Sequence, residues 1–233
     1  MRITFIWFDL GYTLLCWTFA RSYHAVLAEL GHEVDRDLVE RAYHLADKLF
    51  MRDYPGVFGT DPDTFAPWFL GVLNHRLGIR TDLCASWRRL KEALANDRTG
   101  WHPFDGVAEV LADLRRRGYR LGVITNWDSS ARGILAKHGL GGFFEHVVVS
   151  SDVGCEKPDR RIFDLATAAA RVSPAESLYV GDNYYVDTIG ARAAGLASVV
   201  VNRFGRLGVE EITDTPIIAG VGELAGWLEQ RRD

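Results

Sequence analysis

The sequence predicts an α/β protein: a Rossmann-like parallel sheet covered by helices on both faces, with an all-helical bundle inserted after the first strand. Three observations predict this fold class. An apolar run over residues 5–8 ends at a single carboxylate, Asp9, as a buried strand of a parallel sheet does. Residues 16–98 show only helical periodicity. From Trp101 onward, short apolar runs alternate with amphipathic helical segments.

The composition limits the classes of function. The chain has 233 residues, 48% hydrophobic and 25% charged, which is typical of a globular protein with one domain and an insertion or with two domains. Its net charge of −4, without a basic tract, gives no electrostatic case for nucleic-acid binding. Three cysteines without a CxxC pair indicate reduced thiols and no structural zinc, and no stretch reaches the length of a membrane span. We therefore expect a cytoplasmic protein, monomeric or homodimeric, without nucleic-acid or membrane partners.

The first strand positions the most informative carboxylate. Open α/β sheets bind ligands at the carboxyl ends of their strands, so Asp9 is expected at the mouth of a cleft, on a rigid support. Taken alone, Asp-x-Gly is more typical of a turn or a helix cap than of a catalytic residue. The role of Asp9 therefore depends on what the later strands bring to the same edge.

The helical insertion is predicted from apolar residues that recur every three to four positions. A Pro- and Gly-containing loop over residues 52–63 divides it, and nothing between residues 16 and 98 resembles a strand. We assign residues 16–98 to a helical cap domain and residues 1–15 and 99–233 to the α/β core. The expected cap helices cover residues 23–30, 38–51, 64–77 and 84–96.

The second half of the chain predicts the rest of the sheet. Its apolar runs are short, rich in β-branched residues and separated by amphipathic helices, which is typical of parallel βα units. Polar residues follow two of these runs, at Thr125–Asn126 and at Gly181–Asp182, and Lys157 lies between them. Each has an ordinary alternative, as a cap, a turn or a surface residue. The expected strands cover residues 121–124, 147–149, 177–180 and 198–201.

Together these positions resemble the four signatures of the haloacid dehalogenase-like (HAD) hydrolase superfamily, and they occur in the family's order along essentially the whole chain. A helical insertion directly after the first signature resembles the helical (C1-type) cap subclass, and the pattern is phosphatase-like. The matching positions are Asp9 with Thr13, Thr125, Lys157 before Pro158, and Asp182 with Asp187 in the segment GDNYYVD.

The resemblance implies phosphate-ester hydrolysis with Mg²⁺. Asp9 is expected to attack phosphorus and form an aspartyl-phosphate. Asp182 and Asp187, with Asp9 and the Gly11 carbonyl, are expected to hold the cation, because Mg²⁺ takes oxygen ligands. Lys157 and Thr125 are expected to stabilise the phosphoryl oxygens. The implied activity is that of a phosphomonoesterase acting on a small cytosolic phosphorylated metabolite.

Four further positions are expected at the substrate. The backbone N–H groups after Asp9, at Gly11 and Tyr12, are candidates to bind phosphoryl oxygens, and Asn126 and Trp127 are expected to border the pocket. Gly11 departs from the phosphatase pattern, which has a second Asp there as general acid and base. Leaving groups that need little protonation would tolerate its loss. Otherwise Tyr12, a water, His24 or His75 replaces it, or turnover is slow.

Two alternatives remain open at this stage. Hydrolytic dehalogenation of a 2-haloacid also uses an Asp nucleophile and needs no metal. The dehalogenases resembled here, however, have Tyr two residues after the nucleophile, where this chain has Gly11, and they lack the Gly181–Asp182 type of start to the last signature. The second alternative is a low-activity module that binds a phosphorylated ligand or a protein. Such a module would not need the acid that Gly11 replaces.

Overall fold

The computed structural model describes residues 2–96 and 100–230, which fall into two compact units. One unit combines Met1–Cys16 with His102–Asp233, and the other is Trp17–Trp101. The chain therefore passes between the units at residues 16–17 and 101–102. The expected domain boundary at residues 98 and 99 lies outside the described residues.

A six-stranded sheet forms the centre of the α/β unit. Its strand order is β5-β4-β1-β6-β7-β8, and every neighbouring pair is parallel. The predicted fold class is thus confirmed, with the first strand at the point where the strand order reverses. The strands are β1 (Phe5–Phe8), β4 (Arg120–Thr125), β5 (His146–Val149), β6 (Ser177–Gly181), β7 (Ala197–Val201) and β8 (Ile217–Ile218).

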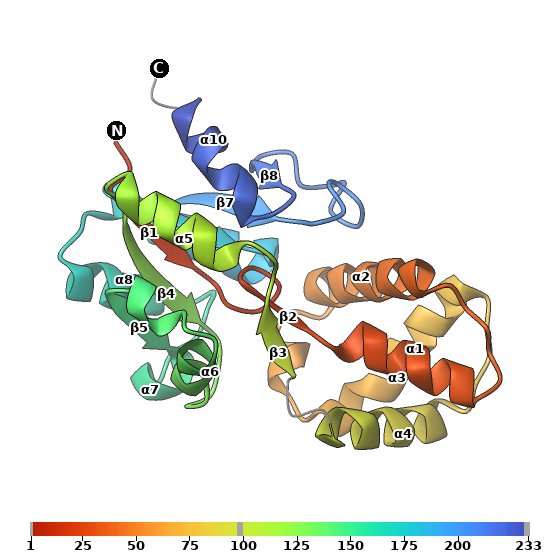
Figure 1. Cartoon of the computed structure of the whole chain (residues 1–233). Coiled ribbons are helices and arrows are strands. Elements are labelled where there is room, and N and C mark those ends of the chain that lie inside the picture. The colour runs from red at the N-terminus through yellow and green to blue at the C-terminus, as the bar shows by residue number, and fades with distance from the viewer. Residues whose placement is uncertain (1, 97–99, 231–233) are drawn as a thin grey trace. The chain divides into compact units, whose positions relative to one another are not determined.

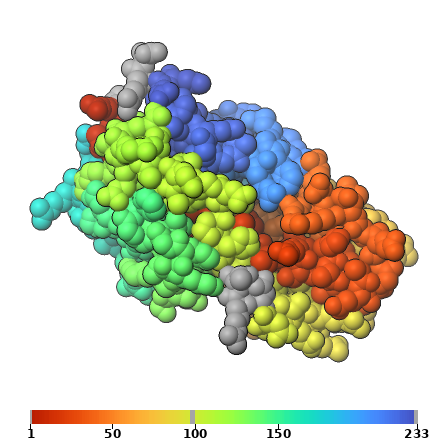
Figure 2. All heavy atoms as spheres, viewed as in Figure 1, coloured from red at the N-terminus to blue at the C-terminus, as the bar shows by residue number. Residues whose placement is uncertain are grey.

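Helices cover both faces of this sheet. Phe5 and Trp7 of β1 pack with α8 and α9 in a buried cluster that includes Phe163 and Ala191. In Figure 1, α5 and α10 lie together along the opposite face. The space-filling view shows the side chains of these two helices in contact (lime and dark blue in Figure 2). The helices are α5 (Val107–Arg116), α6 (Ala131–Lys137), α7 (Ser150–Val153), α8 (Arg160–Ala170), α9 (Ile189–Ala193) and α10 (Leu224–Glu229).

The second unit is a bundle around its own apolar core. Two of its helices begin at aspartates that accept hydrogen bonds from the first turn, Asp35 in α2 and Asp61 in α3. Phe19, Leu27, Phe50 and Leu73 are among the buried residues between the helices. Among the described residues, no helix combines the length and apolar character needed to cross a membrane. The helices are α1 (Phe19–Glu29), α2 (Arg36–Asp53), α3 (Pro62–Leu77) and α4 (Leu83–Asn96).

The structure adds a small sheet that the sequence pattern does not predict. Strands β2 (Leu15–Trp17) and β3 (Trp101–Pro103) pair where the chain passes between the units (Figure 1). The expectation that nothing between residues 16 and 98 is a strand is therefore wrong at residues 16 and 17, which belong to β2. Three-residue strands are too short to show an alternating pattern. Their pairing also joins segments more than 80 residues apart in sequence, and a search for local periodicity does not detect such pairs.

Candidate active site

Three neighbouring strands deliver polar residues to one edge of the sheet. In the order β4-β1-β6, Phe8 lies opposite Val123 on one side and Val180 on the other. Asp9 follows β1 directly, and its N–H donates to the Val180 carbonyl at 2.9 Å. Since all three strands run in the same direction, their carboxyl ends meet here, at the switch point where such sheets bind ligands.

Lys157 reaches this edge from the loop after α7. It is only 4% exposed, and its ammonium group hydrogen-bonds to Asp9 Oδ1 at 2.7 Å, Asp187 Oδ1 at 2.6 Å and the Tyr179 hydroxyl at 2.8 Å. An ammonium has three N–H groups, so each of them has a partner. Burial alone lowers the pKa of Lys157, but the Asp187 and Asp9 carboxylates outweigh it and hold that pKa above its usual value.

Asp187 lies in a turn of π-helix, Tyr184–Thr188, that follows β6. Its Oδ1 accepts from Lys157, and its Oδ2 accepts from the Asn183 N–H at 3.0 Å. Gly181 makes this position possible, because a Cβ there would lie 2.2 Å from Asp187 Oδ2. The Gly in the fourth signature is therefore required by the close approach of a carboxylate to the strand.

The site carries more negative than positive charge. Asp9, Asp182 and Asp187 have carboxylate oxygens within 4.8 Å of one another, and Lys157 is the ammonium bonded among them. Counted formally, this group holds three carboxylates against one ammonium. The pKa of Asp9 is raised to about 7, chiefly by burial and further by the Asp187 and Asp182 charges, which together outweigh the lowering effect of Lys157.

The donor set fits a hard divalent cation. Three carboxylates within reach of one another, with excess negative charge, match the oxygen ligands and the charge that Mg²⁺ requires. The hydroxyls of Thr13 and Thr125 are also buried and have no hydrogen-bond partner among the described residues. Buried hydroxyls are costly to leave unpaired, so these two are suited to a ligand that arrives with acceptor oxygens.

The loop after Asp9 folds back on itself. Gly11 forms a bridge with Leu15, and the Tyr12 N–H donates to the Leu15 carbonyl at 2.6 Å. Tyr12 has a left-handed backbone with φ of 52°, which is uncommon for a residue with a side chain. The Tyr12 N–H, expected at phosphoryl oxygens, is therefore engaged within the loop.

Asn126 and Trp127 bind the neighbouring loops. Asn126 Nδ2 donates to the Lys157 carbonyl at 2.9 Å, and the Lys157 N–H donates to Asn126 Oδ1 at 2.8 Å. The Trp127 N–H donates to the Ser150 hydroxyl at 3.1 Å, and its indole N–H donates to Ser130. Asn126 thus holds the backbone of the residue whose side chain reaches Asp9, a role that the substrate-pocket expectation did not include.

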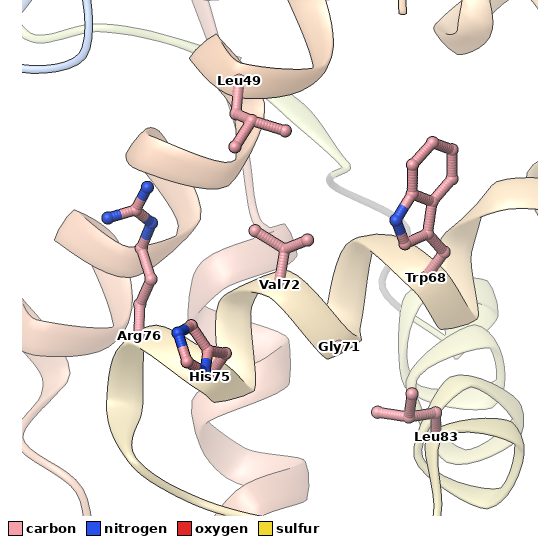
Figure 3. Close-up of a pocket in the computed structure, with 7 residues that line it drawn as sticks. All are labelled: Leu49, Trp68, Gly71, Val72, His75, Arg76 and Leu83. Atoms are coloured by element: carbon pink, nitrogen blue, oxygen red, sulfur yellow. The ribbon is translucent and has the colours of Figure 1, made fainter. Parts of the chain in front are cut away.

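The two histidines considered as replacement acids lie in the helical unit. His24 Nε2 is 3.0 Å from the Val34 carbonyl, a contact within that unit. His75 lines a pocket of about 450 Å³ among α2, α3 and α4, next to Arg76 of α3 and below Leu49 of α2 (Figure 3). Trp68, Gly71, Val72 and Leu83 complete the lining, which contains no carboxylate among the residues described.

Tyr179 is the residue at this site that sequence reasoning missed. It lies within β6, is fully buried, and its hydroxyl contacts Lys157, Asp187 and the Ile124 carbonyl. In the sequence it belongs to the apolar run over residues 177–180, where a Tyr is ordinary for a strand. The sequence did contain one indication of its role: the hydroxyl of a Tyr within a buried strand needs a hydrogen-bond partner.

Comparison with known proteins places the chain in a family. The family described as haloacid dehalogenase-like hydrolase matches residues 72–201, more than half of the chain. Haloacid dehalogenase-like hydrolase domain-containing protein 3 of Homo sapiens is 33% identical over 177 residues, which are 73% of this chain and 70% of that protein. This protein therefore belongs to the haloacid dehalogenase-like hydrolases, and it is an enzyme of that class.

Other relatives differ in their named activities. A phosphoserine phosphatase from Thermus thermophilus is 39% identical over 117 residues, 50% of this chain and 47% of that one. An (S)-2-haloacid dehalogenase from a Pseudomonas species is 31% identical over 138 residues, 59% and 54% of the two chains. Among solved structures, the HAD-hydrolase YfnB from Bacillus subtilis has the same fold, with a TM-score of 0.66, 22% identity and coverage of 98% and 99%.

Proposed function

We propose that this protein is a magnesium-dependent phosphomonoesterase that acts on a small phosphorylated metabolite through an aspartyl-phosphate on Asp9. The observation that carries the proposal is the charge of the site: three buried carboxylates have oxygens within 4.8 Å of one another, and one ammonium, Lys157, is bonded to two of them, Asp9 and Asp187. An excess of carboxylates over cationic groups is costly in a buried site and favours binding of a divalent cation. A dianionic phosphate ester also requires such compensation before a carboxylate can approach it.

Asp9 and Asp182, with the Gly11 carbonyl, are the proposed ligands of Mg²⁺, which when bound supplies positive charge to the phosphoryl oxygens. Asp187 is within reach of the same cluster, but its two oxygens accept from Lys157 and the Asn183 N–H. We therefore assign Asp187 mainly to holding Lys157. The sequence led us to expect that both aspartates of the fourth signature bind the ion. We now propose Asp182 as the ligand and Asp187 as the residue that holds Lys157.

The chain's own residues account for both steps. An Asp9 carboxylate oxygen forms a bond to phosphorus as the bond from phosphorus to the leaving oxygen breaks. Lys157 and the Thr125 hydroxyl donate to the phosphoryl oxygens. Water then adds to phosphorus, the bond to Asp9 breaks, and phosphate leaves. Gly11 provides no proton for the leaving oxygen, so esters and acyl phosphates with good leaving groups are the preferred substrates.

The test is a panel of phosphorylated metabolites, p-nitrophenyl phosphate and 2-haloacids, with and without Mg²⁺, for wild type and Asp9→Asn. Phosphate release that needs Mg²⁺ and is lost in Asp9→Asn supports the proposal. Halide release without metal overturns it in favour of dehalogenation, the activity named for the Pseudomonas relative. No turnover, with Mg²⁺ and phosphate still raising the melting temperature, favours a binding module.

A second variant tests the missing acid. Gly11→Asp restores a carboxyl group two residues after the nucleophile, and general acid help is worth roughly 10²–10⁴-fold. We expect phosphate release from alkyl phosphates, whose leaving groups need a proton, to rise by at least about tenfold, and release from p-nitrophenyl phosphate to change little. An equal effect on both substrates would contradict the leaving-group argument.

A further inference from the structure

Tyr179 occupies a position that no part of the reaction above uses. It is 0% exposed, and its ring packs edge-on against Phe163, with ring centroids 5.2 Å apart. Its hydroxyl nevertheless lies among charged groups, accepting from Lys157 at 2.8 Å and donating to the Ile124 carbonyl at 2.8 Å. A contact to Asp187 Oδ1 is longer, at 3.3 Å. One phenol thus joins the strand before Thr125, the lysine and an aspartate.

We propose that Tyr179 is a positioning residue, which fixes the Lys157 ammonium at the distance and orientation that the phosphoryl group requires. The proposal rests on the proposed phosphatase function for its kinetic consequence, but not for its geometry. Tyr179 touches neither the nucleophile nor, in the proposed reaction, the substrate. It acts through Lys157.

The number of hydrogen bonds explains why a hydroxyl is needed. Each of the three N–H groups of Lys157 has one acceptor, on Asp9, Asp187 and Tyr179. When phosphate ester arrives, one N–H must turn from Asp9 to a phosphoryl oxygen. Asp187 and Tyr179 then hold the other two, so the ammonium stays in place while its third partner changes.

The charge of the cluster explains why a phenol suits this position better than a carboxylate. The site already holds three carboxylates, on Asp9, Asp182 and Asp187, against the single ammonium of Lys157. A neutral acceptor adds a hydrogen bond without adding charge or a further competitor for the cation. The hydroxyl can accept from Lys157 because its own proton goes to the Ile124 carbonyl, which ends the network at a backbone atom.

The test compares Tyr179→Phe with Tyr23→Phe as a matched control. Tyr23 is also fully buried, and its hydroxyl donates to Asn74 Oδ1 at 2.8 Å within the helical unit. Each variant loses one buried hydroxyl and keeps its ring, so both should lose thermal stability, Tyr179→Phe more than Tyr23→Phe because its hydroxyl bonds to a charged group. With p-nitrophenyl phosphate and Mg²⁺, we expect Tyr179→Phe to lower kcat roughly 10- to 100-fold, as for lost hydrogen bonds to charged groups, and to change KM by less than about threefold. Tyr23→Phe should leave both constants unchanged.

A spectroscopic measurement reads the position of the lysine without turnover. The chain has four lysines, Lys48, Lys91, Lys137 and Lys157. The ammonium signal of Lys157 in ¹H–¹⁵N spectra is assigned by its loss in Lys157→Met, or by elimination with Lys→Arg variants at the other three if that protein does not fold. We expect Tyr179→Phe to shift this signal and speed its proton exchange, and Tyr23→Phe to leave it unchanged.

The outcomes separate the two proposals. A lower kcat with an unchanged Lys157 signal overturns the positioning role, and so does an altered signal with kcat unchanged. If wild type releases no phosphate from any ester but the signal responds as expected, the phosphatase proposal fails while the geometric part of this inference stands.

Discussion

Both units of this protein bury a hydrogen-bonded polar network, and the two networks differ in charge and in completeness. In the helical unit, Tyr23 donates to Asn74, and both Asn74 and Ser86 donate to Thr81, so the chain of bonds is neutral. In the α/β unit, Lys157 lies among carboxylates with excess negative charge, and the hydroxyls of Thr13 and Thr125 have no partner among the described residues. A neutral, completed network stabilises a fold, whereas a charged, incomplete one is prepared for a ligand.

Substituting the nucleophile should give the largest difference between the two networks. Asp9→Asn keeps the size of the side chain but replaces the attacking carboxylate with a neutral, weakly nucleophilic amide, so phosphate release should fall by roughly 10⁴-fold or more. Malachite-green detection of phosphate with p-nitrophenyl phosphate measures it. Ser86→Ala, in the neutral network, is the control and should retain the wild-type rate. Substantial activity in Asp9→Asn would contradict the covalent route.

Substitutions at two glycines, one in each unit, compare the space that the structure leaves for an added Cβ. In Gly181→Ala the new Cβ meets Asp187 Oδ2 at 2.2 Å, so Asp187 must move; we expect a loss of about 1–3 kcal/mol in unfolding free energy and at least tenfold in rate. In Gly71→Ala, within α3, the Cβ meets only the terminal methyl of Leu83 at 3.2 Å. Helix propensity then favours Ala by up to about 1 kcal/mol, with the rate unchanged. Urea unfolding measures both, and equal losses would contradict the comparison.

The charged network should also respond to pH in its metal affinity. The pKa of Asp9 is raised to about 7 in the metal-free protein, so below that pH the cation must displace a proton to bind Asp9. Mg²⁺ affinity should therefore rise with pH, by up to about tenfold per unit, and level off above about pH 7. Calorimetric titration from pH 5.5 to 8 measures it. Asp9→Asn should flatten the profile, and a flat wild-type profile would contradict the assignment of Asp9 as a ligand.

Substitutions at two asparagines, one from each network, should give the smallest effects: one on the rate and the other on stability. Asn126→Ala removes both hydrogen bonds to the Lys157 backbone and should lower the rate about tenfold by loosening that loop. Asn74→Ala removes the bonds to Tyr23 and Thr81 and should reduce stability by about 1–3 kcal/mol without changing the rate at a temperature where the protein is folded. Phosphate release and thermal melts are compared for both. A rate loss only in Asn74→Ala would reverse the roles assigned to the two networks.

Sequence reasoning succeeded where local patterns carry the information. Apolar runs ending in Asp9, Thr125 and Gly181–Asp182 are visible without a structure, and the rule that parallel strands share a carboxyl edge is enough to bring their ends together. The fold class followed from the same runs and from the helical periodicity between them. Lys157 was identified only through its resemblance to the family signature, since it lies in a loop.

The contacts that sequence reasoning missed join residues distant in the chain. Tyr179 bonds to Ile124 across 55 positions, and Asn126 bonds to Lys157 across 31. No periodicity reports such pairs, because they depend on strand order and on side-chain geometry at the edge of the sheet. The β2–β3 pair was missed for the same reason, since each strand has only three residues.

The β2–β3 pair also determines how the helical unit is inserted into the chain of the α/β unit. The chain leaves the α/β unit through β2 and returns through β3, and the two are hydrogen-bonded neighbours. The unit Trp17–Trp101 is therefore an insertion whose two ends lie at one pair of hydrogen-bonded strands. The bundle therefore begins and ends at two adjacent junctions, and an exchange of this part of the chain for that of a relative would leave the order of the strands that hold the nucleophile unchanged.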